Sequence, residues 1–183
     1  MKPNEARFFV ALLPPEPVYT EAWQWKEWFR DRYDTHKALN SPPHITLQMP
    51  FRYREDRIEA VEATLKAVAQ AHAPFPVTLP GFGAFPPRVI YLDVERTEPL
   101  SALQKDLSRH LRRNHGIHHA THKDNGFVPH LTVAFRDLKK EAFAEAWAAV
   151  KDKSLDYSYE QAALALLKHD GNVWQVYQSF VLG

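Results

Sequence analysis

The sequence predicts an α+β fold made of two similar lobes, and two features of the chain support this prediction. Apolar residues occur in short runs with strand-like spacing and in longer runs with helical spacing. In addition, one short motif occurs twice, as Pro-His-Ile-Thr-Leu at residues 43–47 and as Pro-His-Leu-Thr-Val at residues 129–133. A helical stretch and then a pair of strand-like stretches follow each copy. We therefore expect one domain over residues 1–183, with duplicated strand–helix–hairpin units at about 42–95 and 128–183 related by an approximate two-fold axis.

The expected elements alternate along the chain. Short apolar runs bounded by Pro, Gly or polar residues predict strands. They lie at residues 7–13, 44–51, 75–85, 88–94, 128–135, 155–168 and 173–182. Apolar residues spaced three and four apart predict helices at residues 16–33, 54–72, 98–114 and 139–151. We expect Pro50 to end the second strand, Asp170-Gly171-Asn172 to form the turn of a final hairpin, and residues 115–127 to be irregular.

The composition excludes several classes of protein. Of the 183 residues, 45% are hydrophobic, which is enough for a sizeable core, and the net charge of +1 is too small for a protein that coats duplex nucleic acid. The chain has no cysteine, so disulfide scaffolds, thiolate zinc sites and cysteine nucleophiles are excluded. The first apolar run, at residues 8–13, is too short for a membrane span. We expect a monomeric protein of the cytoplasm with no membrane partner.

The repeated motif places two kinds of polar side chain on one face of each strand. Side chains alternate along a strand, so His44 and Thr46 share a face, and so do His130 and Thr132. Two such strands across a cleft would present two imidazoles and two hydroxyls. One imidazole can take a proton from an attacking oxygen while the other gives a proton to the leaving oxygen, because the pKa of histidine lies near neutrality. The hydroxyls can donate to phosphate oxygens, so this set predicts acid–base chemistry on a phosphodiester, with no metal and no other cofactor.

Three other interpretations fit the same chain. Both histidines can be ordinary strand-edge residues with satisfied hydrogen bonds. The cleft can also hold a nucleotide or an RNA end without turning it over, as a non-catalytic binding module. The third is a metal-dependent hydrolase built on the histidines of the His-rich stretch, His115, His118, His119 and His122. His118 and His122 are four residues apart and could bind a metal ion together if this stretch were helical. The helix-weakening Gly116 and the lack of an HExxH pattern argue against it.

Long stretches of the chain resemble a known family, the 2H phosphoesterase superfamily, which includes the 2′-5′ RNA ligase-like proteins and cyclic phosphodiesterases. Residues 42–51, 127–133 and 173–183 are similar to a bacterial subgroup of 2′-5′ RNA ligase-like proteins. The resemblance implies two pseudo-symmetric α+β lobes, each an antiparallel sheet with flanking helices, around a central cleft. It also implies an enzyme that opens 2′,3′-cyclic phosphates or reversibly forms 2′-5′ linkages. Its substrates would be RNA ends, nucleotide cyclic phosphates or other small phosphodiesters.

The two His-Thr pairs match the family motif, and the resemblance implies that these four residues are catalytic. One departure concerns an arginine that many relatives place shortly after the second motif, on or near the face of the catalytic pair. Here Phe135 comes first and Arg136 follows it. Strand alternation would put these two side chains on opposite faces, which would alter the contact with an oligonucleotide.

Seven further residues are candidates for substrate binding, because they lie near the motifs and can contact a phosphate or stack on a base. They are Arg52, Tyr53, Arg54, Phe85, Arg88, Lys123 and Phe127. The first three follow the first motif strand, where a solvated loop is the alternative. The next two flank a Pro-Pro turn, where a packed turn is the alternative, and the last two precede the second motif strand. The aromatic run at residues 174–180 alternates like a strand, and we interpret it as core rather than as a ligand site.

Overall fold

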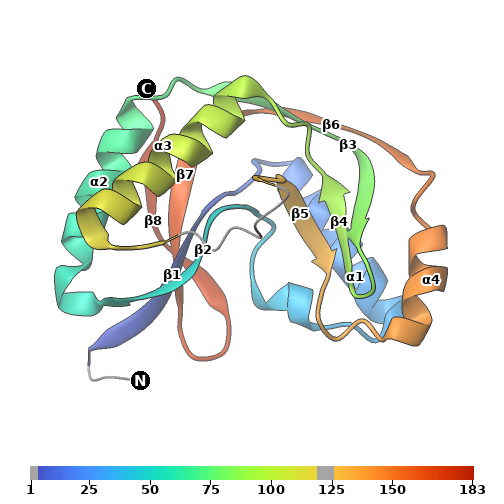
Figure 1. Cartoon of the computed structure of the whole chain (residues 1–183). Helices are drawn as coiled ribbons and strands as arrows, with labels where there is room; N and C mark the ends of the chain where they lie inside the picture. Colours follow the sequence, from blue (N-terminus) through green and yellow to red (C-terminus); the bar gives the residue numbers. More distant parts are fainter. Residues whose placement is uncertain (1–3, 119–125) are drawn as a thin grey trace.

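The computed structural model describes residues 4–118 and 126–183, and Figure 1 shows how its elements are arranged. Eight strands lie in this part of the chain: β1 (Glu5–Leu12), β2 (Ile45–Arg54), β3 (Phe75–Phe85), β4 (Val89–Asp93), β5 (His130–Ala134), β6 (Ser154–Gln161), β7 (Ala163–His169) and β8 (Trp174–Val181). The helices are α1 (Val18–Tyr33), α2 (Ile58–Gln70), α3 (Glu98–His115) and α4 (Lys140–Ala148), with the short 3₁₀ helices η1 (Lys37–Asn40) and η2 (Glu55–Arg57). The predicted α+β class is confirmed.

These eight strands form one antiparallel sheet in the order β6-β3-β4-β5-β2-β1-β7-β8. The strands that carry the repeated motif, β5 and β2, lie at its centre and divide it into two four-stranded halves. They are joined by a single pair of residues, Ile45 with Leu131, which we call the central pair. In Figure 1 the two halves diverge from this junction, and each is accompanied by its own helices. The halves do not correspond to the predicted units, because residues 42–95 and residues 128–183 each contribute strands to both halves.

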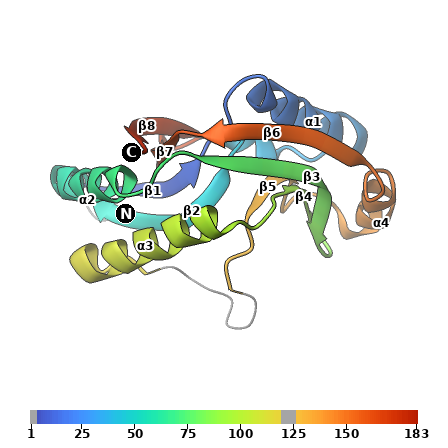
Figure 2. The same ribbon diagram turned by 90° about the horizontal axis from the view of Figure 1, so that it is seen from above.

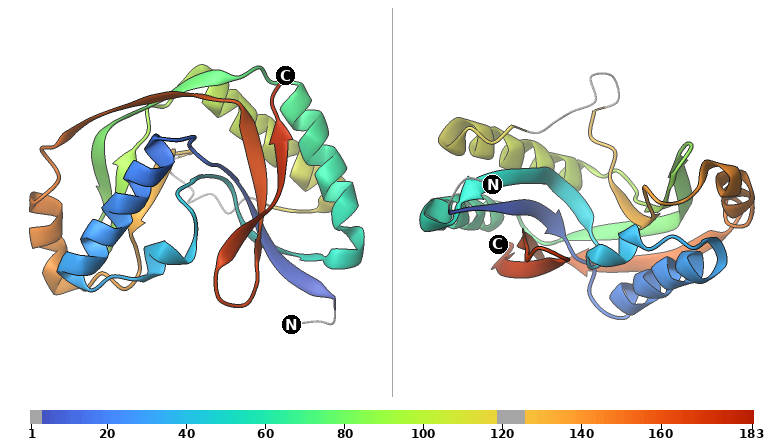
Figure 3. Two further views of the ribbon diagram at one scale, coloured as in Figure 1. Left: turned by 180° about the vertical axis from the view of Figure 1, so that it is seen from behind. Right: turned by 90° about the horizontal axis from the view of Figure 1, so that it is seen from below.

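One large apolar core lies between the sheet and the helices. It contains residues of all four α-helices, such as Phe29 of α1 and Leu107 of α3. In Figures 2 and 3, α2 and α3 lie together at one end of the molecule, and α1 and α4 lie at the other. A second, small cluster lies on the opposite face of β1 and β7, and it consists of Phe9, Ala11, Ala165 and Leu167. Strand β1 therefore buries apolar side chains on both of its faces, which accounts for its almost uninterrupted apolar sequence.

The single strand predicted at residues 155–168 is wrong, because this segment forms two strands. At one edge of the sheet β6 pairs with β3, whereas β7 lies between β1 and β8 in the other half. The chain changes partners at Ala162. Next to this break, the side-chain amide of Gln161 donates hydrogen bonds to the carbonyl oxygens of Leu13 (3.3 Å) and Ala163 (2.6 Å). The segment thus carries the chain from one half of the sheet to the other, as Figure 2 shows.

Pro50 does not end the second strand as predicted but lies inside β2. The register of β1 against β2 shifts at this point, so that Met49 and Pro50 together lie opposite the single residue Phe9. Such a β-bulge tolerates proline, because the residue need not donate a hydrogen bond to the ladder. On its other side, β2 pairs with β5 at Ile45 alone. Pro50 therefore has no direct partner in the register of either neighbouring strand.

The remaining predicted strands and helices are confirmed, with differences of a few residues at their ends. The largest difference is at the start of α2, which begins at Ile58 rather than at residue 54. The second motif strand, β5, is shorter than predicted at both ends, because it begins at His130 and ends at Ala134. Among the described residues, no helix combines the length and the apolar character that a membrane-crossing helix requires.

Candidate active site

The central pair brings the two motifs together. In an antiparallel ladder, the neighbours of one paired residue lie opposite the neighbours of its partner. The central pair therefore places His44 next to Thr132 and Thr46 next to His130. Both members of the central pair are fully buried in the core, so these four polar side chains project from the other face of the sheet. The ladder thus brings together the two imidazoles and two hydroxyls that the motifs predict.

The same hydrogen bond holds both histidine rings. The Nδ1 atom of His44 lies 2.7 Å from the carbonyl oxygen of Pro42, and the Nδ1 atom of His130 lies 2.8 Å from the carbonyl oxygen of Val128. A carbonyl oxygen can only accept, so Nδ1 carries the proton in each ring. The lone pair of the neutral ring is then on Nε2. Each ring is therefore oriented by the segment that precedes its own strand, and it can exchange a proton at Nε2.

The two rings lie in different electrostatic surroundings. Burial lowers the pKa of His44 to about 3, and the ammonium group of Lys26 adds to this lowering. Burial also lowers the pKa of His130, but the carboxylate of Asp93, its partner across β4 and β5, acts in the opposite direction. His44 is therefore the ring that binds a proton less readily, and His130 is the ring that binds one more readily.

Aromatic side chains lie against both histidines. The ring centroid of Phe9 is 4.8 Å from that of His44. The ring centroids of Phe85 and Tyr91 are 5.0 Å and 5.1 Å from that of His130. These rings reduce the exposure of the imidazoles to water, which accounts for the lowered pKa values.

Gly83 makes room for one of these aromatic rings. It pairs with Tyr91 across β3 and β4, and a Cβ atom at this position would lie 2.2 Å from the Tyr91 ring. Any other residue would therefore force the ring away from β3. The glycine thus allows Tyr91 to contact both Phe85 and His130.

Phe85 and Arg52, two of the seven predicted substrate-binding residues, lie on the face that carries the motifs. The ring of Phe85 meets that of His130 edge-on, with an interplanar angle of 90°. Arg52 pairs with Arg7 across β1 and β2, and cross-strand partners share a face of the sheet. Since Phe9 lies two residues after Arg7 on the same strand and contacts the first motif, Arg52 lies on the side of the motifs.

Three other candidates have different surroundings. Tyr53 packs against the main core, and its hydroxyl lies 3.3 Å from Nδ1 of His115. Arg54 is exposed and donates a 2.9 Å hydrogen bond to Asp56. Phe127 packs against the main core. The structure does not bring these side chains to the motif residues.

Arg88 and the segment after the second motif form a contact of their own. Arg88 donates a 3.3 Å hydrogen bond to the carbonyl oxygen of Arg136. The expected alternation of Phe135 and Arg136 is wrong, because β5 ends at Ala134 and Arg136 has a left-handed φ of 60°. The guanidinium of Arg136 instead lies over the Phe135 ring, 4.7 Å from its centroid. Lys123, the remaining candidate, lies outside the described residues.

Sequence reasoning missed four residues beside the motifs: Phe9, Lys26, Tyr91 and Asp93. A signal existed for two of them, because Tyr91 and Asp93 alternate along a strand that follows the first motif. Phe9 lies in an apolar run that gives no indication of which face is open. Lys26 lies in an amphipathic helix, where a charged residue is normally expected on the solvent side.

The His-rich stretch gives little support to a metal site. The ring nitrogens of His115 form hydrogen bonds with the hydroxyl groups of Tyr53 (3.3 Å) and Thr64 (2.7 Å). Both nitrogens are engaged, so neither is available to a metal ion. Within the part of the chain that the structure describes, no three His, Asp or Glu residues are grouped so that they could hold a metal ion. His119 and His122 lie outside the described residues.

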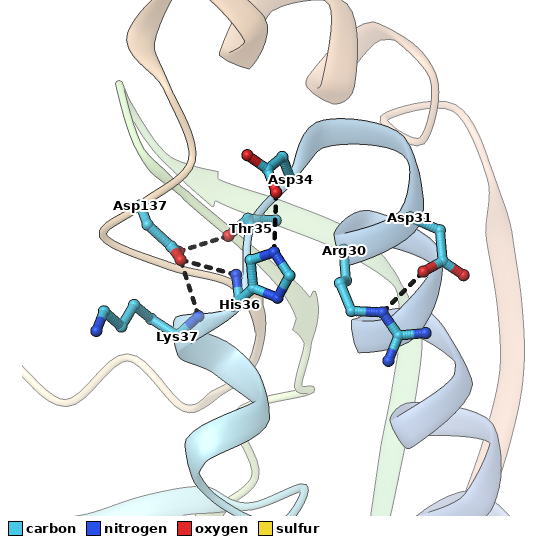
Figure 4. Close-up of polar contacts among 7 residues, drawn as sticks. All are labelled: Arg30, Asp31, Asp34, Thr35, His36, Lys37 and Asp137. Carbon is cyan, nitrogen blue, oxygen red and sulfur yellow. Dashed lines mark hydrogen bonds and ion pairs between the residues drawn. The ribbon is translucent and has the colours of Figure 1, made fainter. Parts of the chain in front are cut away.

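A polar clamp, which Figure 4 shows, joins the segments around both motifs. Asp137, which follows β5, accepts hydrogen bonds from the Thr35 hydroxyl (2.7 Å) and from the backbone N–H groups of His36 (2.7 Å) and Lys37 (3.0 Å). The residues that it binds lie just before the segment that leads to the first motif. Burial raises the pKa of Asp137, but the hydrogen bonds outweigh this effect and hold the pKa below its ordinary value.

We expect Asp137→Asn to lower the free energy of unfolding at pH 7 by about 1–3 kcal/mol, because it replaces three charge-assisted hydrogen bonds. The pKa of Asp137 is lower in the folded chain than in the unfolded chain, where it is about 3.9. Its contribution to the free energy of unfolding is therefore fully present above about pH 3.9 and is lost as the pH falls through the folded-state pKa. Denaturant unfolding at pH 7 and pH 3 measures this, and the difference between the variant and the wild type should shrink in acid. The control is Asp31→Asn, which removes the exposed pair with Arg30 drawn in Figure 4. Equal effects of the two substitutions would contradict the prediction.

Comparison with known proteins gives the family of the chain. A family model described as the 2′-5′ RNA ligase superfamily matches residues 14–173. A protein of Geobacillus kaustophilus, provisionally named a phosphoesterase, is 30% identical over 180 residues, covering 97% of this chain and 96% of that protein. Another provisionally named phosphoesterase, from Bacillus cytotoxicus, is 33% identical over 179 residues, covering 95% of each chain.

Solved structures share the fold at lower identity. The TT0787 protein of Thermus thermophilus superposes with a TM-score of 0.70 at 22% identity, covering 96% of this chain and 97% of that one. LigT of E. coli in its apo form also gives 0.70, at 18% identity, covering 97% and 98%. LigT in complex with 3′-AMP gives 0.70 at 17% identity, with the same coverage. The chain therefore belongs to the 2′-5′ RNA ligase superfamily, a family of 2H phosphoesterases, as the resemblance of its paired motifs implies.

Proposed function

We propose that this phosphoesterase opens 2′,3′-cyclic phosphates of nucleotides or RNA ends, with His44 and His130 as an acid–base pair and without a metal ion. One observation supports the proposal more than any other. The central pair joins β2 to β5 so that each motif histidine lies beside the threonine of the other strand. Nε2 of each ring is the atom that can exchange a proton, because Nδ1 is held by a backbone carbonyl.

In the proposed reaction a water molecule attacks the phosphorus atom of the cyclic phosphate. His44, which is neutral at pH 7 because its pKa is lowered to about 3, takes a proton from this water at Nε2. A protonated His130 gives its Nε2 proton to the ribose oxygen as the P–O bond to that oxygen breaks. One proton enters one ring and one leaves the other, and exchange with solvent restores the starting state. The carboxylate of Asp93 favours the protonated form of His130.

Thr46 and Thr132 act on the phosphate itself in this proposal. Their hydroxyl groups donate hydrogen bonds to the non-bridging oxygens, which gain negative charge as water adds to phosphorus. A hydrogen bond to a charged group contributes roughly 1.5–3 kcal/mol. Because this charge is greatest in the transition state, the two hydroxyls accelerate the reaction as well as hold the substrate.

The relatives support a nucleotide substrate. LigT of E. coli forms complexes with 3′-AMP, with ATP and with NADP⁺. A nucleotide with a 3′-phosphate is what remains when the bond from phosphorus to the 2′-oxygen of a cyclic phosphate is broken. With a 5′-hydroxyl in place of water, the same acid–base pair would join a 2′-5′ linkage, and the reverse reaction would cleave it. We therefore propose nucleotides and RNA ends as the partners of the chain.

Incubation with a panel of cyclic phosphates tests the proposal. We expect the chain to convert adenosine 2′,3′-cyclic phosphate to a single product, either the 2′- or the 3′-phosphate, at the same rate with and without EDTA. Chromatography that resolves the two isomers is the measurement. Saturable binding without product would favour the non-catalytic binding module. Loss of turnover with EDTA, restored by a metal ion, would favour the metal-dependent hydrolase.

A further inference from the structure

A row of aromatic side chains leads away from His44 along the open face of β1, toward the hairpin of β7 and β8. The ring of Phe9 lies 4.8 Å from that of His44, and the ring of Trp174 lies 4.7 Å from that of Phe9. Phe9 is only 3% exposed, whereas Trp174 is partly exposed. Trp174 is therefore the first ring in this row that a ligand extending from the motif residues can reach.

A cation lies over this tryptophan. The guanidinium of Arg7 is 5.1 Å from the centroid of the Trp174 ring. A tryptophan and an arginine arranged in this way form a surface on which any nucleobase can pack, because every base has a π face. The interpretation of the aromatic run at residues 174–180 as core is confirmed for Phe180, which is buried, but is wrong for Tyr177, which is exposed. Trp174 packs against the small cluster and also keeps part of its surface open.

Two arginines lie opposite each other next to this ring. Arg7 of β1 pairs with Arg52 of β2, and both side chains are exposed. Like charges directly opposite each other destabilise a sheet. Within the described part of the chain, neither arginine forms an ion pair with a carboxylate. A phosphate bound between them would remove the repulsion and accept hydrogen bonds from both guanidinium groups.

Arg7 also lines a hollow of about 670 Å³ beside the hairpin of β7 and β8, together with His169. His169 also contacts Trp174, with ring centroids 4.9 Å apart. Two of the carboxylates in this hollow are already satisfied, because Glu55 pairs with Lys168 and Asp170 accepts hydrogen bonds from backbone N–H groups of its own turn. The volume lies in the range of small-molecule sites.

We propose that Trp174, Arg7 and Arg52 form a subsite for the nucleotide that adjoins the reacting phosphate, so that the preferred substrate is a single-stranded oligonucleotide rather than a mononucleotide. This inference rests on the proposed function, because it takes the reacting phosphate to lie at His44. The base of the adjoining nucleotide packs on Trp174 and Arg7, and the linking phosphate lies between the two arginines. A base on an aromatic platform and a phosphate between guanidinium groups are sequence-independent contacts, so the subsite selects for length rather than for sequence.

The test compares two substrates in the full chain: adenosine 2′,3′-cyclic phosphate and an adenylate trimer that ends in a 2′,3′-cyclic phosphate. We expect Trp174→Ala and Arg7→Gln each to lower kcat/KM for the trimer about tenfold, while kcat/KM for the mononucleotide stays within about twofold. Trp174→Phe keeps a ring and should retain most of the activity on the trimer. The matched control is Arg32→Gln. Arg32 also lies over a tryptophan, with its guanidinium 4.4 Å from the centroid of the Trp28 ring, but both residues belong to α1 and not to the strands that carry the motifs.

Two outcomes would overturn the subsite and leave the proposed function standing: equal losses on both substrates, or unchanged turnover of the trimer. Thermal unfolding of each variant shows whether a loss of activity comes from misfolding. If Trp174→Ala does not fold, the activity of Arg7→Gln decides whether the subsite exists, because Arg7 is exposed and its substitution leaves the core intact. If the wild type opens neither substrate, the proposed function fails, and binding still tests the subsite. In that case, fluorescence anisotropy with a labelled adenylate trimer 3′-phosphate is the measurement. Equal Kd values for the wild type and Trp174→Ala would reject the subsite.

Discussion

His44→Ala and His130→Ala should each lower kcat for opening a 2′,3′-cyclic phosphate by about 10²–10⁴-fold, the usual contribution of one positioned acid or base. Each substitution removes one of the two proton transfers that the reaction requires. The double variant should lose little more than the more impaired single variant, because a proton taken up at one ring is useful only if the other ring releases one. Steady-state turnover at saturating substrate measures kcat, and single-turnover rates with the enzyme in excess measure the chemical step without a contribution from product release.

The control for these variants is His36→Ala, which removes an exposed imidazole that pairs with Asp34. It should leave turnover unchanged. Stability gives a second readout, because the lowered pKa of His44 makes the folded protein lose stability as the pH falls from 6.5 toward 3, and His44→Ala should not show this loss. Turnover within tenfold of the wild type in both single variants would rule out the acid–base pair.

The arrangement of the motifs was predictable because it depends on local geometry. Alternation along a strand puts His44 with Thr46 and His130 with Thr132, whatever the rest of the fold does. Helical spacing likewise predicted α3 to within one residue, since its buried leucines recur along one face. These periodicities are properties of a single segment, so the sequence of that segment is enough to reveal them.

The features that depend on distant partners were not predictable. The break at Ala162 exists because β6 and β7 pair with strands in opposite halves of the sheet, and no periodicity within residues 155–168 records that change. Trp174 belongs to an alternating strand, but its partial exposure follows from its position above Phe9 and beside Arg7. The same limit applies to Pro50, which is tolerated because of a register shift against β1.

Lys26 is the clearest case of a residue that the sequence does not mark. It is 1% exposed on α1, and its Nζ donates hydrogen bonds to the carbonyl oxygens of Ala38 (2.9 Å) and Ser41 (2.8 Å). Ser41 directly precedes Pro42, whose carbonyl oxygen orients the His44 ring. Lys26 thus acts on the first motif in two ways, through the backbone that leads to it and through its charge.

Lys26→Met should remove a pH dependence from the stability of the protein. Burial lowers the pKa of Lys26 to about 7, whereas a lysine in an unfolded chain has a pKa of about 10.4. Between these values the unfolded chain binds more protons than the folded chain, so the free energy of unfolding rises with pH. Between pH 7 and pH 9 the wild type should gain up to about 2 kcal/mol that the variant does not gain. The change with pH is the readout, because the lost hydrogen bonds also alter the absolute stability.

The same variant should shift the pH profile of kcat/KM. Without the Lys26 ammonium, the pKa of His44 rises, so the acid limb that reports His44 moves to higher pH. Burial of His44 remains, and the limb should therefore stay below pH 6.5. Lys37→Met is the matched control, since Lys37 is an exposed lysine in the adjoining η1 helix. An acid limb at the same pH in Lys26→Met as in the wild type would mean that the ammonium has no influence on His44, and the electrostatic difference between the two histidines would need another cause. A change of stability with pH that is the same in both proteins would contradict the lowered pKa of Lys26.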